Sequence, residues 1–323
     1  MTHAPETAPA AEAGAAPAAT RTLRVVVAML TYKRPDDLAA AVPALLAQAG
    51  SVPDDVRLLV VDNDPDGSAR AYVEASGADY LHEPRPGIAA ARNAAITATG
   101  DADVLVFIDD DERPVDRWLA LLLATYRETG APCVVGPVVS EFAVQPDAWV
   151  RAGRFFDRRR LPTGTPVTVA ATNNLLLDVA TLRRTGVRFD EAFGLSGGSD
   201  TLFSRTLVAR GLRMVWCDEA VVVDVVPADR STRAWVLHRA RRSGNSASRC
   251  AVALAGSAAG RTRARVRAVL EGSVRVGAGA ARTAVGAVLR SPEHDARGRR
   301  TLARGTGMVS GAVGHVVYDY ARG

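Results

Sequence analysis

The segment 104–119, VLVFIDDDERPVDRWL, constrains the fold more than any other part of the chain. It opens with apolar residues that are mostly β-branched or aromatic, which predicts a buried strand. Three aspartates, Asp109 to Asp111, and then Glu112 follow this strand. Like charges at a strand end repel one another, and a divalent cation relieves the repulsion because hard cations bind carboxylate oxygens. An acidic solvated loop is the alternative, but the α/β pattern around the segment favours a metal site.

Polar residues gather where three predicted strands end. The strand 24–30 is followed by 31–34 (TYKR), the strand 56–61 by 62–63 (DN), and the strand 104–108 by the aspartates. Helical patterns follow each strand, which predicts a parallel sheet with right-handed crossovers and a ligand at its carboxyl edge. Alternation along a strand would place Asp109 and Asp111 on one face and turn Asp110 away.

The pattern changes after Pro132. The sequence predicts strands at 134–139, 167–177 and 214–226, a loop-rich stretch at 141–165, a helix at 201–210 and helical structure from about Ala234. Residues 1–20 are Ala, Pro and Glu with little to bury, so we expect a disordered tail. This tail lacks the basic start and apolar run of a signal peptide.

The cysteines at 133, 217 and 250 lie far apart and form no CxxC pair. They predict neither a disulfide framework nor a zinc site, and a reducing cytoplasm fits them best. No stretch reaches the roughly 18 uncharged apolar residues of a membrane span.

Seven motifs occur in order, and together they resemble the family 2 glycosyltransferases, which are inverting enzymes of the GT-A fold. The motifs are AMLTYKRPDDL, VVDND, RPGIAAARNAA, FIDDDE…P…WL, ATNNLLL, FDEAFG…GGSDT and RGLRMVWCDEAVVV. The resemblance covers about residues 23–246, and the basic tail is similar to that of succinoglycan-type exopolysaccharide glycosyltransferases. It implies an α/β fold with a Rossmann-like mixed sheet flanked by helices, a GT-A domain at 21–248 and a helical extension at 249–323.

The resemblance also implies a metal site for Mg²⁺ or Mn²⁺ at the acidic strand end. Asp111 is its best direct ligand, and Asp109 would hold the ribose or a second metal position. Asp110 is open between metal binding and structure. Many relatives place a His after the Val-rich strand, where this chain has Asp224. Asp224 is either a hard oxygen ligand or a strand-end residue.

For the nucleotide, the resemblance implies Thr31, Tyr32, Arg34, Asp62 and Arg92. Tyr32 could stack on the base, Arg34 could pair with phosphate, and Asp62 would accept a hydrogen bond from the base imide. An exposed loop remains the alternative for Arg34, and a helix-surface charge for Arg92.

Asn173 and Asn174 lie near the presumed sugar site, where paired amides suit hydroxyl recognition or satisfy backbone groups in a bulge. An inverting transfer needs a carboxylate to take the acceptor's proton. The family uses a Glu-Asp pair; this chain has Ser199-Asp200, so Asp200 is the candidate base. The competing interpretation is that Asp200 or Ser199 only caps a helix.

The resemblance thus implies a metal-dependent transfer of one sugar from a nucleotide-diphosphate sugar to a saccharide or lipid-linked acceptor. A single addition is expected because the processive Gln-x-x-Arg-Trp signature is missing from 238–246 (HRARRSGNS). A nucleotidyltransferase stays open, although TYKR lacks the glycines of its phosphate loop. A non-catalytic nucleotide-sugar binding protein is the third possibility.

The charge of the chain is uneven. Residues 229–323 carry eighteen Arg against five acids, while the whole chain is only +5. Apolar residues recur near helical spacing between these arginines, which is typical of a helix that lies on a membrane surface. We therefore expect a cytoplasmic protein with a peripheral contact to anionic membrane on its inner face, and no nucleic-acid partner. Nucleic-acid binding is the rival interpretation of the basic stretch, and a helical subdomain packed on the catalytic core is the other alternative.

Overall fold

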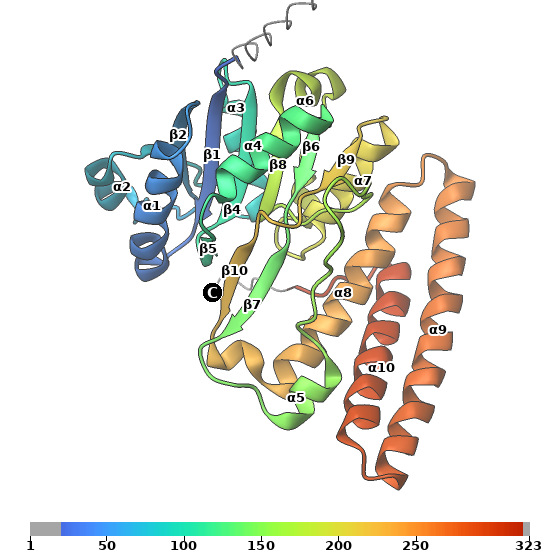
Figure 1. Cartoon of the computed structure of the whole chain (residues 1–323). Helices are drawn as coiled ribbons and strands as arrows, with labels where there is room; N and C mark the ends of the chain where they lie inside the picture. Colours follow the sequence, from blue (N-terminus) through green and yellow to red (C-terminus); the bar gives the residue numbers. More distant parts are fainter. Residues whose placement is uncertain (1–20, 319–323) are drawn as a thin grey trace, which may run out of the picture.

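The computed structural model describes residues 21–318. These residues form a mixed seven-stranded sheet with helices on both faces, a smaller three-stranded sheet and a layer of long helices at the C-terminal side (Figure 1). The predicted fold class is therefore confirmed. The tail at 1–20, predicted to be disordered, lies outside the described residues.

The main sheet has the order β3-β2-β1-β4-β8-β6-β9. Its strands are β1 Arg24–Thr31, β2 Asp55–Asp62, β3 Asp79–His82, β4 Val104–Asp109, β6 Cys133–Val135, β8 Asn174–Asp178 and β9 Met214–Trp216. The first four in sequence run parallel, and β8 runs antiparallel to both of its neighbours. The parallel strands are almost continuously apolar because helices cover both of their faces.

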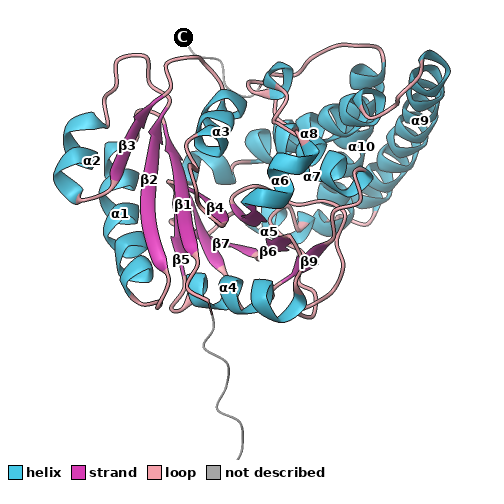
Figure 2. Cartoon of the chain, turned by 90° about the horizontal axis from the view of Figure 1, so that it is seen from above, coloured by secondary structure: helices cyan, strands magenta, loops and turns pink. Residues whose placement is uncertain are grey.

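Short helices cover the two faces of this sheet (Figure 2). They are α1 Pro35–Gly50, α2 Arg70–Ser76, α3 Ile88–Thr97, α4 Trp118–Thr129, α6 Val179–Thr185 and α7 Ser199–Ala209, with the 3₁₀ turn η1 Glu191–Phe193. The short helix α5 Ala148–Gly153 and the 3₁₀ turn η2 Ala228–Ser231 pack instead against the C-terminal helices. One face packs against α1 and α4 through residues such as Leu45 and Leu122. The other packs against α3, α6 and α7 through residues such as Ala91, Leu182 and Phe203.

The second sheet, in the order β5-β10-β7, corrects two of the predicted strands. Its strands are β5 Glu112–Pro114, β7 Val138–Phe142 and β10 Val222–Val226. The predicted strands 134–139 and 214–226 are each two strands that belong to different sheets. Gly136 and Pro137 separate the first pair, since proline cannot donate to a ladder. The predicted strand 167–177 begins only at Asn174.

Three long helices form the C-terminal layer: α8 Arg233–Ala253, α9 Ala258–Val288 and α10 Pro292–Ala312. α10 lies between α8 and α9, and α9 is outermost (Figures 1 and 2). The sequence predicts a division between a GT-A domain ending at residue 248 and an extension beginning at residue 249. α8 runs without a break through this point. The division stays a proposal. Within residues 21–318, no helix combines the length and apolar character needed to cross a membrane.

Candidate active site

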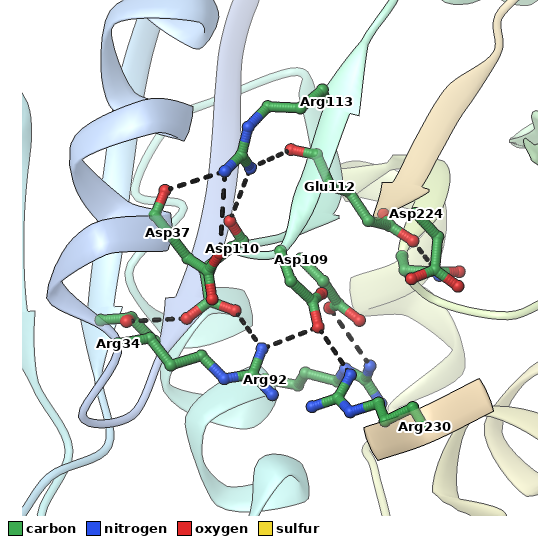
Figure 3. Close-up of polar contacts among 12 residues, drawn as sticks. Arg34, Asp37, Arg92, Asp109, Asp110, Glu112, Arg113, Asp224 and Arg230 are labelled. Carbon is green, nitrogen blue, oxygen red and sulfur yellow. Dashed lines mark hydrogen bonds and ion pairs between the residues drawn. The ribbon is translucent and has the colours of Figure 1, made fainter. Parts of the chain in front are cut away.

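Four consecutive carboxylates lie where β4 leads into β5 (Figure 3). β4 ends at Asp109, the next two residues form a turn, and β5 begins at Glu112. Arg113 braces this turn by donating from Nη1 to the carbonyl oxygens of Asp110 and Glu112, each at 2.9 Å. The sequence therefore concentrates negative charge at a fixed point on the carboxyl edge of the parallel strands.

Asp110 is 4% exposed and lies between two donors. Thr31 Oγ1 donates to its Oδ2, and Arg34 Nη1 donates to its Oδ1, both at 2.8 Å. The same Nη1 donates to Asp111 Oδ2 at 2.8 Å. Asp110 and Asp111 thus share one guanidinium, so the predicted alternation of faces is wrong: the strand stops before it could impose one. Burial outweighs the nearby Arg34 charge and raises the pKa of Asp110 to about 6.

Asp111 lies between two arginines that come from distant parts of the chain. Arg34 precedes α1, and Arg230 in η2 donates from Nη1 to Asp111 Oδ2 at 3.2 Å. Arg34 is therefore no free loop residue but part of the acidic edge. Guanidinium groups in this position also suit the oxygen atoms of a phosphate.

Arg92 connects the acidic edge to the start of α7. It is 5% exposed on α3, so the interpretation as a helix-surface charge is wrong. Its Nη2 lies 3.8 Å from Asp109 Oδ1, and its Nη1 donates to Ser199 Oγ at 3.4 Å. Burial, opposed by Arg92 and reinforced by neighbouring carboxylates that include Asp200, raises the pKa of Asp109 to about 7. Asp200 therefore lies within electrostatic reach of the acidic edge.

Glu112 is the most deeply buried member of the cluster, at 1% exposure. Asn173 Nδ2 donates to its Oε1, while its Oε2 has no partner among the described residues. Glu112 is paired in register with Asp224 on β10, whose Oδ2 accepts a hydrogen bond from Arg158 at 2.9 Å. Burial and the neighbouring carboxylates raise the pKa of Glu112 well above its usual value.

The acidic edge fits a divalent cation as an open site rather than as a closed cage. Among residues 21–318, no three His, Cys, Asp or Glu side chains converge so that they alone hold a metal. Mg²⁺ usually takes one or two protein carboxylates together with substrate phosphates. Asp109 and Asp111 offer such donors, and Glu112 beside them has a buried oxygen without a hydrogen-bond partner.

The residues expected to hold the base occupy two different settings. Tyr32 is half-buried, and the Nζ of Lys33 lies 5.7 Å from its ring centroid. Asp62 is fully buried; its Oδ1 accepts from the Asp64 N–H and its Oδ2 from the Ala69 N–H. These contacts make Asp62 the organiser of the 62–69 loop, and its contact with a base stays a prediction.

The two neighbouring asparagines differ. Asn173 is half-buried and contacts Glu112, which keeps it at the acidic edge. Asn174 is 1% exposed; it donates to the carbonyl oxygens of Pro137 and Ala220 and accepts from the indole of Trp118. Its amide is fully engaged inside the protein, so we correct its expected sugar contact: Asn174 satisfies buried backbone groups.

Asp200 lies in the first turn of α7, after two glycines with positive φ. The helix begins at Ser199 and its N-cap is Gly198, with no side-chain cap. The interpretation of Asp200 or Ser199 as a plain N-cap is therefore wrong. The Oδ1 of Asp200 accepts from the Thr201 N–H at 2.9 Å. A half-buried carboxylate thus follows directly after Ser199, the residue that Arg92 contacts.

Sequence reasoning missed three residues that complete this arrangement: Glu112 as a buried acid, Arg158 as the partner of Asp224, and Arg230 as a partner of Asp111. Glu112 carried a signal, since a fourth acid after three aspartates needs compensation. The arginines carried none, because the chain holds 39 of them and no motif surrounds Arg230.

Comparison with known proteins agrees on one family. The family model described as glycosyl transferase family 2 matches residues 26–185. The succinoglycan biosynthesis protein ExoM of Rhizobium meliloti (strain 1021) is 37% identical over 236 residues, which cover 70% of this chain and 74% of that protein.

One solved structure shares the architecture. The mannosyltransferase PcManGT from Pyrobaculum calidifontis, in complex with GDP-Man and Mn²⁺, superposes with a TM-score of 0.56 at 18% identity, over 88% of this chain and 86% of that one. This likeness shows a common fold. GalNAc-T7 with UDP, GalNAc and Mn²⁺ gives a TM-score of 0.48 at 12% identity, over 68% of this chain and 51% of that one.

Proposed function

The chain belongs to glycosyl transferase family 2 and is a glycosyltransferase, and from this premise we propose that it moves one sugar, with inversion, from a nucleotide-diphosphate sugar. The proposed acceptor is a saccharide or a lipid-linked saccharide, and the proposed reaction depends on Mg²⁺ or Mn²⁺. Family membership decides against the nucleotidyltransferase and the non-catalytic binding protein. The similarity to a succinoglycan biosynthesis protein supports a role in polysaccharide biosynthesis.

One observation carries the proposal: Arg92 connects the acidic edge at Asp109 with the first turn of α7, where Asp200 lies. Ligands of parallel sheets bind at this carboxyl edge. The two groups of carboxylates come from separate segments, about ninety residues apart in sequence, so they can address opposite sides of one substrate. An inverting displacement requires this, because the nucleophile enters opposite the leaving group.

We assign the acidic edge to the diphosphate of the donor. Asp111 and, next to it, Asp109 would hold the cation, with Asp224 as the third carboxylate near Glu112. A bound cation neutralises the charge that develops on a diphosphate leaving group. Arg34 would contact the same phosphates, because its guanidinium already lies against Asp110 and Asp111.

We assign the remaining donor contacts to the loop after β1 and to β8. Thr31 fixes Asp110, Tyr32 would stack on the base, and Asn173 would contact the sugar from its position beside Glu112. Asp62 supports this region through the loop that it organises.

Asp200 is proposed as the general base. Its carboxylate would accept the proton of the acceptor hydroxyl while that oxygen attacks the anomeric carbon. The bond from this carbon to the diphosphate oxygen breaks, and its electron pair leaves on the diphosphate. Two alternatives earlier in the chain have structural roles: Asp190 is the side-chain N-cap of η1, and Glu191 pairs with Arg85.

A cytoplasmic location with a peripheral contact to anionic membrane is also proposed. The three cysteines are free and buried, as expected in a reducing compartment. The excess of arginine in the C-terminal layer supports the membrane contact.

The metal and the donor are tested together by measuring thermal shifts with several nucleotide-diphosphate sugars, with and without Mn²⁺. Asp111→Asn should remove the metal-dependent part of donor binding while the protein stays folded. Asp101→Asn, an exposed aspartate near the other end of β4, is the matched control and should behave like wild type. If Mn²⁺ changes neither the affinity of the wild-type protein for UDP nor its affinity for GDP, the metal assignment is refuted.

The base is tested by steady-state kinetics once a donor is known. Asp200→Asn should lower kcat by about 10²–10⁴-fold and leave donor affinity near wild type. NMR of the product should show the inverted anomeric configuration. Retention of more than about a third of wild-type transfer would rule out Asp200 as the base, because the loss would be far smaller than base removal causes. Asp190, Glu191 and Asp224 would then be the candidates.

A further inference from the structure

α9 packs on α10 through its smallest residues. Its buried positions are Ala268, Gly272, Gly279 and Gly286. A Cβ added at Gly279 would lie 2.5 Å from the Leu302 nitrogen, and one at Gly286 would lie 2.4 Å from the Asp295 nitrogen. The two helices therefore meet backbone to backbone, and no large apolar side chain of α9 is needed for their contact.

Five large apolar side chains of α9 lie exposed on the opposite face. With two small residues between them they form what we call the outer stripe: Val266, Leu270, Val274, Gly277, Ala281, Val285 and Val288. Its intervals of four, four and three residues repeat every eleven, close to three full helical turns, so the stripe stays on one side of the helix. The five larger members are exposed by 53%, 62%, 71%, 44% and 81%.

This arrangement reverses the ordinary amphipathic helix, which buries its apolar face against its own protein. Packing small residues inward and large apolar residues outward is how helices associate within lipid. The outer stripe runs from Val266 to Val288, 22 helical steps or about 33 Å at the usual helical rise. An apolar surface of this length on the outermost helix indicates an external partner.

Charge identifies the partner. Residues 258–312 contain eleven arginines against three carboxylates. Four arginines, at 261, 263, 265 and 267, lie exposed at the start of α9. A pocket of about 380 Å³ between α9 and α10 is lined by five more, and the Nε of one of them, Arg282, is buried without a partner. Anionic lipid headgroups would balance this excess.

A second copy of the chain would not balance it. Pairing two outer stripes would bring the arginines of both α9 helices together. The only carboxylate on α9 is Glu271, which already pairs with Arg267 and Arg275. Self-association would therefore add like charges without new counter-charges.

We propose that α9 lies in the plane of an anionic lipid surface, with the outer stripe inserted among the acyl chains and the flanking arginines at the phosphates. This deepens the peripheral contact proposed above and does not depend on which sugar is transferred. Too much of α9 is charged for it to cross the bilayer, whereas in the interface the charged side stays in water.

The test is co-sedimentation of the full chain with vesicles of equal parts phosphatidylcholine and phosphatidylglycerol, against phosphatidylcholine alone. Leu270→Gln combined with Val274→Gln should weaken binding to the anionic vesicles at least about tenfold, since two apolar side chains no longer enter lipid. Val144→Gln combined with Val313→Gln is the matched control: these residues are 59% and 70% exposed and lie off the stripe. Raising the salt should weaken wild-type binding, because exposed charges are screened.

Three results would overturn the proposal: a wild-type protein that ignores anionic vesicles, equal losses in the stripe and control variants, or a lipid-free dimer that the stripe variant converts to monomers. Donor affinity should be the same in all variants, because the outer stripe is remote from the acidic edge. A protein that binds anionic vesicles through the stripe but transfers no sugar would support this inference and refute only the proposed function.

Discussion

The sheet region and the C-terminal helical layer are held together in opposite ways. In the sheet region, large side chains such as Trp118, Phe107 and Leu122 are fully buried between strands and helices. In the helical layer, glycines bring backbones together: a Cβ on Gly307 of α10 would lie 1.8 Å from the carbonyl oxygen of Arg241 on α8. The difference shows where each region directs its apolar side chains, inward for a catalytic scaffold and outward for a contact surface.

The same substitution in the two regions gives the largest expected difference. Leu122→Ala removes a fully buried side chain beneath the sheet and should cost about 2–5 kcal/mol of unfolding free energy. Leu270→Ala, on the exposed stripe, should change it by less than about 0.5 kcal/mol. Urea titration of both variants measures this. A large loss of unfolding free energy for Leu270→Ala would mean that the outer stripe packs within the protein. The contrast between the sheet region and the helical layer would then be wrong.

Glycine-to-alanine substitutions test the packing of the helical layer by adding a methyl group instead of removing one. Gly307→Ala should destabilise by about 1–3 kcal/mol, because the added methyl group meets the backbone of α8. Gly277→Ala, on the exposed face of α9 with nothing within 4 Å, should stabilise by up to about 1 kcal/mol through helix propensity. If both variants are equally stable, the close approach of α8 and α10 is not what holds the layer.

The sequence predicted the sheet region well where the signal is local. The strands predicted at 24–30, 56–61 and 104–108 follow β-branched runs, and their observed ends differ by one residue or fewer from the predicted ones. The strands after Pro132 were harder to predict, since residues such as Gly136 and Pro137 divide one apolar run between two sheets. Periodicity alone does not say which sheet a short strand joins.

The candidate site was predicted in part for the same reason. A run of adjacent acids, such as Asp109 to Asp111, is visible in the sequence itself. The order of the family motifs pointed to Arg92 and Asp200. Arg230 and the orphaned oxygen of Glu112 depend on contacts over more than a hundred residues or on burial, which a single sequence does not encode locally. In the helical layer, the periodicity of α9 was visible, but which face is buried became clear only from its glycine contacts.

The smallest expected effect concerns one carboxylate in each region whose charge stabilises the fold. Asp178 caps α6; although burial opposes it, hydrogen bonds from Thr181 and Tyr126 hold the pKa of Asp178 below its usual value. In the helical layer, the hydrogen bond from Arg267 lowers the pKa of Glu271, which lies at the surface of α9 and is half-exposed. In both cases the folded state favours the ionised form. The stabilisation is therefore complete above the unfolded pKa of about 4 and is lost as the pH falls through the lower folded value.

The two carboxylates should differ in how salt affects them. Asp178→Asn keeps a good N-cap and removes only the charge, so it should cost about 1 kcal/mol at neutral pH, and the difference from wild type should close as the pH falls well below 4. Glu271→Gln should cost at most a few tenths of a kcal/mol, because its exposed ion pair is screened by solvent. High salt should erase the Glu271 difference and leave that of Asp178, whose partners are uncharged, half-buried hydrogen-bond donors rather than exposed charges. Urea midpoints of both variants and wild type, measured at neutral and acidic pH and at low and high salt, test these differences in stability. Equal salt sensitivity of the two variants would show that Asp178 is stabilised by the exposed Arg184 charge and not by the interior of the sheet region.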